Sequence, residues 1–379
     1  MYKPKLLILC TVIIALSLLT PAYAETIAPE ISAPSALLMD YSTGEILYEK
    51  NPHEKKPMAS VTKIMTMLIA MEEIDAGNLS YDDIITASAH AKSYGGSTIF
   101  LEEGEQMSVT DILKGVAVAS GNDAAVALGE HISGTEAAFV QRMNQRAAEL
   151  GMTNTNFVNC NGLDADGHYS TAYDIALMSR ELMKHPDIFT YTTIWMDSLR
   201  GGAFTLSNTN KLVRFYEGST GLKTGSTSKA GFCISATAKR DNMHLIAVIM
   251  AAETSKSRQA DASALLNYGF STFAVTQPVS CDDGVGSIRV EKGTEKMVDV
   301  MPAENCNVVT AKNDKCEFEV VTNPNKKIKA PVNAGDVAGT LTVFLNGNEY
   351  KTINLVCAQS IPKASFSFVF KELLTDWLC

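Results

Sequence analysis

Apolar residues along this chain follow first a strand pattern, then a helical pattern, and then a strand pattern again. Two short apolar runs at 36–40 and 46–48 flank a turn at 42–44 and predict a hairpin. Apolar positions then recur at helical spacing, which predicts helices at 64–71, 109–119, 124–131, 136–150 and 171–184. Strand-like runs return at 221–226, 231–238 and 244–250, and a closing helix is expected at 258–268.

This order of elements predicts an α/β domain at residues 25–273. Its antiparallel sheet is flanked by helices and takes strands from both ends of the domain. After residue 278 the composition changes to short runs rich in strand formers, separated by Gly, Pro, Asn and Asp. This change predicts a small all-β domain at 279–356.

The last segment, 360–379, carries Phe366, Phe370 and Trp377 at helical spacing, interrupted by charges such as Lys371. It is too charged to span a membrane. Amphipathic helices rich in Phe and Trp are typical of segments that lie in the headgroup plane, so we predict a membrane-surface anchor here. A helix packed on its own β-domain is the alternative.

Residues 1–24 have the pattern of a signal peptide. Lys3 and Lys5 precede an apolar run at 6–19, and Ala22-Tyr23-Ala24 fits the cleavage pattern. An uncleaved anchor is the alternative, although the run is short for a bilayer span. We therefore predict an exported, extracytoplasmic protein that begins at residue 25. Loss of the two lysines changes the formal net charge from −10 to −12, which argues against a nucleic-acid partner.

Seven of the eight cysteines lie after the predicted cleavage site. An exported protein favours some pairing, and the odd number leaves at least one thiol over. Cys281, Cys306 and Cys316 all fall in the strand-rich part, so we expect a disulfide among them, with free buried thiols as the alternative. No two cysteines have C-x-x-C spacing, and the acidic residues around His168 lack the glycine of a calcium loop. We expect no metal and no cofactor.

Ser60-Val61-Thr62-Lys63 combines a nucleophile with a base. The Ser-x-x-Lys pattern also occurs at 226–229 and 360–363, so by itself it is a weak signal. Residues three apart on a helix share a face, which places Lys63 beside Ser60. Lys63 can accept the Ser60 proton only if its pKa is lowered by burial and by a neighbouring positive charge, for which Lys223 is the candidate.

Two further motifs follow in the order that this chemistry requires. Ser120-Gly121-Asn122 lies between two predicted helices, where the hydroxyl can pass a proton to a leaving amine and the amide can hold a substrate carbonyl. Lys223-Thr224-Gly225 offers a cation and a hydroxyl suited to a carboxylate. The backbone N–H groups of Ser60 and Ser226 are the expected oxyanion donors. Taken singly, helix capping and a surface strand also explain the two motifs.

The three motifs resemble the signatures of low-molecular-mass penicillin-binding proteins, the serine D-alanyl-D-alanine carboxypeptidases. The second motif continues through Asp123-Ala124-Ala125 and the third through Ser226-Thr227. The resemblance extends to 162–164, 167–172 and 265–270, so it covers nearly all of the first domain. It implies the serine penicillin-recognising fold, a signal peptide, a small C-terminal β-domain and, in many members, an amphipathic anchor helix on the outer face of the bacterial cytoplasmic membrane.

By this resemblance, the serine attacks the bond between the two D-alanines that end a peptidoglycan stem pentapeptide, and water hydrolyses the acyl-enzyme. β-Lactams would acylate the same serine. The residues assigned to catalysis are Ser60, Lys63, Ser120, Asn122 and Lys223, and those assigned to substrate binding are Thr224, Gly225, Ser226, Thr227 and Arg258.

Arg258 lies outside the three motifs, and Ser226 departs from the residue that many relatives carry. Arg258 matches the position of an arginine that helps to hold the terminal carboxylate, with a solvated charge at a helix start as the alternative. Many relatives carry His where this chain has Ser226, which leaves open what that side chain contributes to deacylation.

Two other functions use the same motifs. A class A β-lactamase adds a Glu-x-x-x-Asn pattern between the second and third motifs. Five glutamates lie in that interval, and none has Asn four residues later: Glu130, Glu136, Glu149, Glu181 and Glu217. A non-catalytic wall-binding protein would keep the fold and lose the activity, yet every chemically demanding residue is present.

Overall fold

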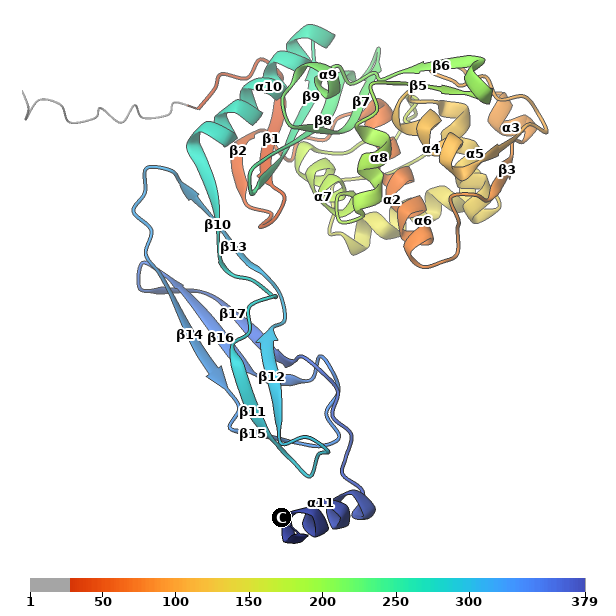
Figure 1. Ribbon diagram of the computed structural model, residues 1–379. Helices are drawn as coiled ribbons and strands as arrows, with labels where there is room; N and C mark the ends of the chain where they lie inside the picture. Colours follow the sequence, from red (N-terminus) through yellow and green to blue (C-terminus); the bar gives the residue numbers. More distant parts are fainter. Residues whose placement is uncertain (1–27, 379) are drawn as a thin grey trace, which may run out of the picture.

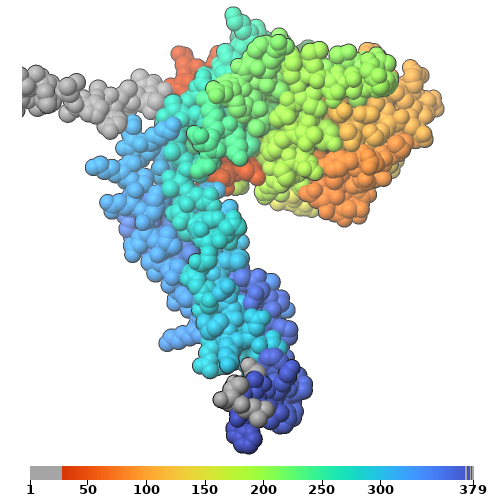
Figure 2. All heavy atoms as spheres, in the orientation of Figure 1, coloured from red at the N-terminus to blue at the C-terminus, as the bar shows by residue number. Residues whose placement is uncertain are grey.

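The computed structural model describes residues 28–378 and has two parts that differ in shape (Figure 1). A globular α/β part contains the elements up to α10, and a narrower β-rich part extends from it and ends in helix α11 (Figure 2). The predicted signal peptide at 1–24 lies outside the described residues.

The α/β part is built on a five-stranded sheet with the order β2-β1-β9-β8-β7. All its neighbouring strands are antiparallel, and β1 pairs with β9 so that Ser35 lies opposite Met250. The beginning and the end of the domain therefore share one sheet, which confirms the predicted fold class. The strands are β1 (Ser35–Asp40), β2 (Ile46–Lys50), β7 (Ser219–Thr227), β8 (Gly231–Arg240) and β9 (Met243–Ala252).

Helices cover both faces of this sheet. Successive side chains of a strand point to opposite faces, and β9 divides accordingly. Ile246, Val248 and Met250 pack into the core that contains α2 and α7, whereas Leu245 and Ile249 pack into the core under α10. Because both faces are covered, β9 has an almost continuous apolar sequence instead of an alternating one.

The six longer helices of the α/β part agree with the predicted ones to within a few residues, and four of these six begin after a capping side chain. Ser108, Thr135, Thr171 and Thr254 each accept a hydrogen bond from the backbone N–H three residues later. The helices are α2 (Lys63–Asp75), α3 (Ala89–Lys92), α4 (Val109–Ala117), α5 (Asn122–Ser133), α6 (Glu136–Glu149), α7 (Ala172–Leu182), α8 (Phe189–Thr192), α9 (Leu212–Phe215) and α10 (Ser255–Thr272).

Several short elements were not predicted. They have too few residues to show a hydrophobic period. They are the four-residue helices α3, α8 and α9, the 3₁₀ turns η1 (Ala59–Thr62), η2 (Pro186–Ile188) and η3 (Arg200–Gly202), and two antiparallel strand pairs, β3 (Ile84–Thr86) with β4 (Gln106–Ser108) and β5 (Met196–Leu199) with β6 (Phe204–Ser207).

The β-rich part contains a two-stranded sheet, β10-β13, and a six-stranded sheet with the order β14-β16-β17-β12-β11-β15. Residues 276–278, which the sequence marks as a boundary, lie inside β10, where Thr276 pairs with Val308 and the register shifts before Val279 pairs with Cys306. The strands are β10 (Phe273–Val279), β11 (Gly286–Glu291), β12 (Met297–Pro302), β13 (Cys306–Ala311), β14 (Phe318–Pro324), β15 (Lys327–Lys329), β16 (Val337–Leu345) and β17 (Asn348–Cys357).

The predicted disulfide in this part is wrong. Cys281, Cys306 and Cys316 are all unpaired, as are the other cysteines within residues 28–378. Cys306 points into a small apolar core with Val308 and Leu355, whereas Cys281 and Cys316 are partly exposed. The thiol of Cys306 therefore acts as a small apolar side chain.

Helix α11 (Phe366–Leu378) lies at the end of the molecule farthest from the α/β part (Figure 1). The rings of Phe366 and Phe370 stack with centroids 6.2 Å apart. Phe366 is 86% exposed and Trp377 is 85% exposed, so these rings are not packed on the β-domain. Among the described helices, none is both long enough and apolar enough to cross a bilayer.

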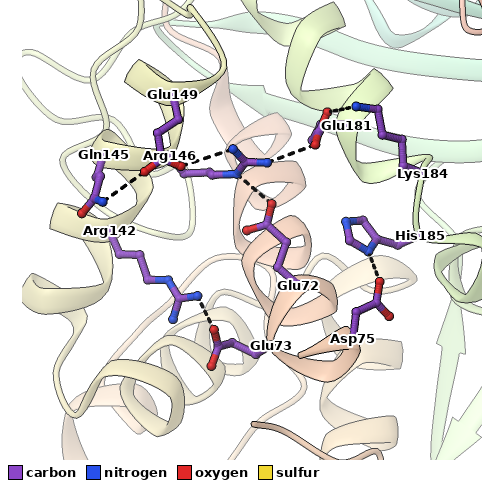
Figure 3. A network of polar contacts seen from close by, with 10 residues as sticks. All are labelled: Glu72, Glu73, Asp75, Arg142, Gln145, Arg146, Glu149, Glu181, Lys184 and His185. Carbon is purple, nitrogen blue, oxygen red and sulfur yellow. Dashed lines mark hydrogen bonds and ion pairs between the residues drawn. The ribbon is translucent and has the colours of Figure 1, made fainter. Parts of the chain in front are cut away.

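Arg146 of α6 joins three helices through carboxylates (Figure 3). Its guanidinium contacts Glu72 of α2 at 2.7 Å, Glu181 of α7 at 3.0 Å and Glu149 of α6 itself at 3.2 Å. Arg142 pairs with Glu73 beside it. A hollow of about 480 Å³ is lined by Glu72, Arg142, Gln145, Arg146 and Glu149, and its charged side chains take part in these ion pairs.

We expect R146L to lower the free energy of unfolding by about 1 to 2 kcal/mol, because three carboxylates lose a shared cation that is only partly solvated. Thermal and urea denaturation measure the effect. K184M, which removes an exposed partner of Glu181, is the matched control and should change stability by less than about 0.5 kcal/mol. Equal stability of R146L and wild type would contradict this role of Arg146.

Candidate active site

Ser60 lies in the 3₁₀ turn η1, directly before the core helix α2. The sequence predicts Ser60 at the start of the α-helix itself, but the helix begins at Lys63. Ala59 has a φ of +49°, an unusual value for a residue with a side chain, and the Thr62 hydroxyl donates to its carbonyl at 2.8 Å. Ser60 therefore lies in a strained turn that the Thr62 hydrogen bond stabilises. Lys63 lies beside Ser60, as predicted.

Lys63 is completely buried and donates to three oxygens. Its Nζ lies 3.0 Å from Ser60 Oγ, 2.6 Å from Asn122 Oδ1 and 2.6 Å from the backbone carbonyl of Asn161. The first two contacts join the first and second motifs. The third partner is a backbone atom, which no residue pattern marks.

Burial lowers the pKa of Lys63 to about 7, although Cys160 and Asp123 nearby act in the opposite direction. Burial also holds the pKa of Lys223 well below its ordinary value, and the positive charges of Lys63 and Arg258 add to this effect. Burial and the charge of Lys223 were both expected to lower the Lys63 pKa. Burial does so, but Lys223 is not among the causes of the Lys63 shift, whereas Lys63 contributes to the shift of Lys223.

The second motif connects α4 to α5. Ser120 has a φ of +63° and lines the cleft, and Asn122 is the first residue of α5. The Asn122 side chain donates to the carbonyl of Gly95 at 2.7 Å, and its backbone N–H donates to the carbonyl of Ser97 at 2.7 Å. The amide that was expected to hold a substrate carbonyl is therefore bound on both sides, to Gly95 and to Lys63.

The third motif lies on the edge strand β7, against the Ser60 turn. Lys223 is buried and donates to the carbonyl of Thr224 at 2.9 Å, and the Thr224 hydroxyl contacts the hydroxyl of Thr209 at 2.7 Å. A Cβ at Gly225 would lie 2.7 Å from the backbone nitrogen of Ser60. Only glycine lets the strand approach this closely.

Two more predicted residues follow in the same strand. Ser226 is exposed and lines the cleft. Thr227 does not line the cleft, and its hydroxyl donates to Asp164 Oδ1 at 2.6 Å. Thr227 therefore ties β7 to the loop that contains Asp164.

Arg258 lies inside the first turn of α10, not before it, and is only 5% exposed. The alternative of a solvated charge at a helix start is therefore wrong. Its guanidinium has two long contacts, to the Cys233 carbonyl at 3.4 Å and the Ser255 hydroxyl at 3.2 Å. Its Nε is buried without a partner among residues 28–378. Burial lowers the Arg258 pKa to about 10, so the side chain remains cationic at neutral pH.

These residues surround a cleft of about 270 Å³. Lys63, Asn122 and Lys223 lie behind its surface, and the lining is formed by Ser60, Ser97, Ser120, Thr209, Thr224, Gly225, Ser226, Phe232, Ser255 and Arg258. Hydroxyl groups and one guanidinium thus converge on the nucleophile. Such a cleft suits a peptide that ends in a carboxylate.

No group of three or more metal-ligating side chains occurs in the part of the chain that the structure describes. His168, which the sequence analysis compared with metal ligands, is buried against η1. Its Nδ1 accepts from the backbone N–H of Val158 at 3.0 Å, and its Nε2 lies 2.7 Å from the Thr62 hydroxyl. This residue supports the nucleophile turn.

Two protein-family models match this chain, one over the α/β part and one over the β-rich part. Residues 22–254 match the peptidase S11 family, described as D-alanyl-D-alanine carboxypeptidase, and residues 273–363 match the C-terminal domain of penicillin-binding protein 5. The chain belongs to this family of serine peptidases, the low-molecular-mass penicillin-binding proteins. It is 40% identical to the D-alanyl-D-alanine carboxypeptidase DacF of Bacillus subtilis, with 98% of each chain covered.

Solved structures of the family share the fold. Penicillin-binding protein 5 of Haemophilus influenzae is 31% identical with a TM-score of 0.73, covering 89% of this chain and 99% of that one. Penicillin-binding protein D2 of Listeria monocytogenes, in its ampicillin-bound form, is 34% identical with a TM-score of 0.56, covering 64% of this chain and all of that one. The predicted family and penicillin-recognising fold are therefore confirmed.

The site also contains groups that the sequence analysis missed. The carbonyls of Gly95 and Asn161 contact the motif side chains, and Asp164 contacts Thr227. A backbone carbonyl has no residue signature, so the first two could not be found from the sequence. The resemblance at 162–164 was the only signal given by the sequence for this part of the site.

A neutral Lys63 is needed to accept a proton, so acylation of Ser60 by a labelled penicillin should become faster as the pH rises through about 7 and then level off. Stopped-flow measurement between about pH 5 and pH 9 tests this profile. The pKa of the neighbouring His168 is lowered by burial to about 4, so His168 does not titrate in this window. A rate independent of pH across the window would contradict the assignment.

Proposed function

We propose that this enzyme removes the terminal D-alanine from peptidoglycan stem pentapeptides through an acyl-enzyme on Ser60. The observation that carries the proposal is the 3.0 Å contact between Ser60 Oγ and a buried Lys63 amine whose pKa is near neutrality. A serine needs such a base to become a nucleophile at neutral pH.

In the proposed acylation step, Lys63 takes the Ser60 proton as Oγ attacks the carbonyl carbon between the two D-alanines. The backbone N–H groups of Ser60 and Ser226 stabilise the oxyanion. The C–N bond then breaks as the departing D-alanine amine receives, through Ser120, the proton that Lys63 took from Ser60. A water molecule next attacks the acyl carbon and gives a proton to the neutral Lys63, and this proton passes to Ser60 Oγ as the ester bond breaks.

The substrate carboxylate is proposed to bind Arg258 and the Thr224 hydroxyl. Arg258 supports this role because it lines the cleft, is buried and has an unpaired Nε. Lys223, behind the cleft wall, adds to the electrostatic attraction for an anion when it is protonated. An unpaired buried cation makes binding of a carboxylate strongly favourable.

β-Lactams are proposed to acylate the same serine, as the ampicillin-bound relative indicates. A class A β-lactamase remains a weaker candidate, because no glutamate in the interval between the second and third motifs has the required Asn. A non-catalytic wall-binding protein is disfavoured by the contact between Ser60 and Lys63.

Wild type and S60A should differ completely in release of D-alanine from a peptide that ends in D-Ala-D-Ala, because the variant has no nucleophile. Release is measured by a coupled D-amino-acid oxidase assay. Mass spectrometry of the protein after incubation with penicillin should show an adduct on wild type only. Equal release by both proteins would overturn the mechanism. Absence of an adduct on folded wild type would favour the non-catalytic alternative, whereas an adduct on Ser60 without release from the peptide would point to an acyl-trapping sensor or to a different substrate.

We further propose that residues 1–24 are a cleaved signal peptide, that 25–273 form the catalytic domain, that 279–356 form a spacer, and that 360–379 rest on the outer face of the cytoplasmic membrane. The exposed rings of Phe366 and Trp377 support the last point. Their apolar area becomes buried if the helix lies among lipid headgroups. This arrangement would hold the cleft away from the membrane, near the wall peptides.

Deletion of 360–379 should release the mature protein from the membrane fraction while D-alanine release in solution is retained, because α11 lies at the end of the molecule farthest from the α/β part, which supplies all the cleft-lining residues (Figure 1). Fractionation followed by immunoblotting measures the distribution. F366S/F370S/W377S is a milder variant that keeps the length of the chain. Continued membrane association of the deletion variant would rule out the tail as the anchor.

A further inference from the structure

Glu136 is the first residue of α6 and does not line the cleft, yet its carboxylate contacts two loops that reach the site. Its Oε1 accepts from the backbone N–H of Cys160 at 3.3 Å and from the Cys160 thiol at 3.4 Å. Its Oε2 accepts from the Tyr94 hydroxyl at 2.5 Å and lies 3.0 Å from His90 Nε2. One carboxylate therefore joins loops that are distant in the sequence.

Each of these loops supplies a carbonyl to the motif side chains at the very next residue. Cys160 precedes Asn161, whose carbonyl accepts from Lys63. Tyr94 precedes Gly95, whose carbonyl accepts from the side-chain nitrogen of Asn122. A carbonyl can only accept, so Gly95 fixes the Asn122 amide with its oxygen towards Lys63.

The two carbonyl groups that face Lys63 determine where its lone pair points. A neutral amine has two N–H bonds and one lone pair. The Asn122 amide oxygen and the Asn161 carbonyl can only accept, and each lies 2.6 Å from Nζ, so they take the two hydrogens. The lone pair is left facing Ser60 Oγ, the atom whose proton it must accept.

Glu136 is suited to hold these loops because it stays ionised. Its side chain is only 12% exposed. Burial alone would raise its pKa, but the hydrogen bonds from Tyr94, His90 and Cys160 hold the pKa below its ordinary value. Its place in the first turn of α6 also favours a negative charge.

We propose that Glu136 is a positioning residue for acylation, which fixes the loops at 94–95 and 160–161 so that Asn122 and Asn161 aim the Lys63 lone pair at Ser60. This inference rests on the proposed role of Lys63 as the base. It assigns a function to one of the glutamates that fail the β-lactamase pattern, and that function requires no contact with the substrate.

The variants E136M, E136Q and Y94F separate positioning from folding. Methionine removes both hydrogen-bonded links. Glutamine can keep both, because its amide oxygen can accept from Cys160 and its amide nitrogen can donate to the Tyr94 oxygen. Y94F removes one link only. E149M, with the same substitution on the same helix, is the control, since Glu149 bonds to Arg146 and Gln145 away from these loops.

The readouts are the acylation rate constant and the dissociation constant of the non-covalent complex with a chromogenic β-lactam, together with the melting temperature. For E136M we expect acylation to slow by about tenfold or more while the dissociation constant changes by less than about threefold, because the cleft lining is not altered. Y94F should show a smaller loss, and E136M/Y94F should be no slower than E136M. E136Q and E149M should acylate within about threefold of wild type.

A folded E136M with the wild-type acylation rate overturns the inference, as does an equal loss in rate constant and affinity, or a glutamine variant as slow as the methionine variant. If E136M does not fold, Y94F decides, and a folded Y94F with the wild-type rate overturns it. Absence of an adduct on Ser60 in the wild type would instead overturn the proposed function.

Discussion

The buried amine of Lys63 is the group on which the site depends. In water its pKa would keep it charged and useless as a base. Burial in the core lowers the pKa to about 7, and three oxygens hold the nitrogen in place. The chain therefore places a polar group at the start of a helix whose next eight residues are all buried. The cost of burying it is offset by hydrogen bonds to each donor position.

The packing of the sheet and the helices holds the three motifs around Lys63. The strand β7 approaches the Ser60 turn closely because Gly225 has no side chain. The Thr227 hydroxyl joins the same strand by a hydrogen bond to the loop that contains Asp164. Helix α6 makes a different set of polar contacts at each of its ends. Its first residue, Glu136, contacts the loops beside the site, and Arg146 near its end joins α2 and α7 through carboxylates (Figure 3).

The β-rich part and α11 contribute nothing to the cleft lining. They extend from the end of α10, where Val309 of β13 and Val275 of β10 still pack into the core under α10, and two separate apolar cores follow farther along (Figure 1). Within residues 28–378, Cys306 and Cys357 are unpaired and buried as apolar side chains, and the strands of this part are joined by their backbone hydrogen bonds. The residues of the cleft therefore all lie in the α/β part, and the exposed aromatic helix α11 lies at the end of the β-rich part.

The sequence by itself determined the elements and the residues that carry chemistry, because hydrophobic period and motif order are local properties. The sheet with strands from both ends, the helices 109–119 and 136–150 and the Ser60, Ser120 and Lys223 motifs all follow from it. Only the tertiary structure decided that burial is the main cause of the low Lys63 pKa and that the Asn122 amide is already bound on both sides. It also decided that the carbonyls of Gly95 and Asn161 contact the motif side chains and that Glu136 contacts the loops beside them. Burial and carbonyl direction depend on contacts between distant segments, which no local pattern encodes.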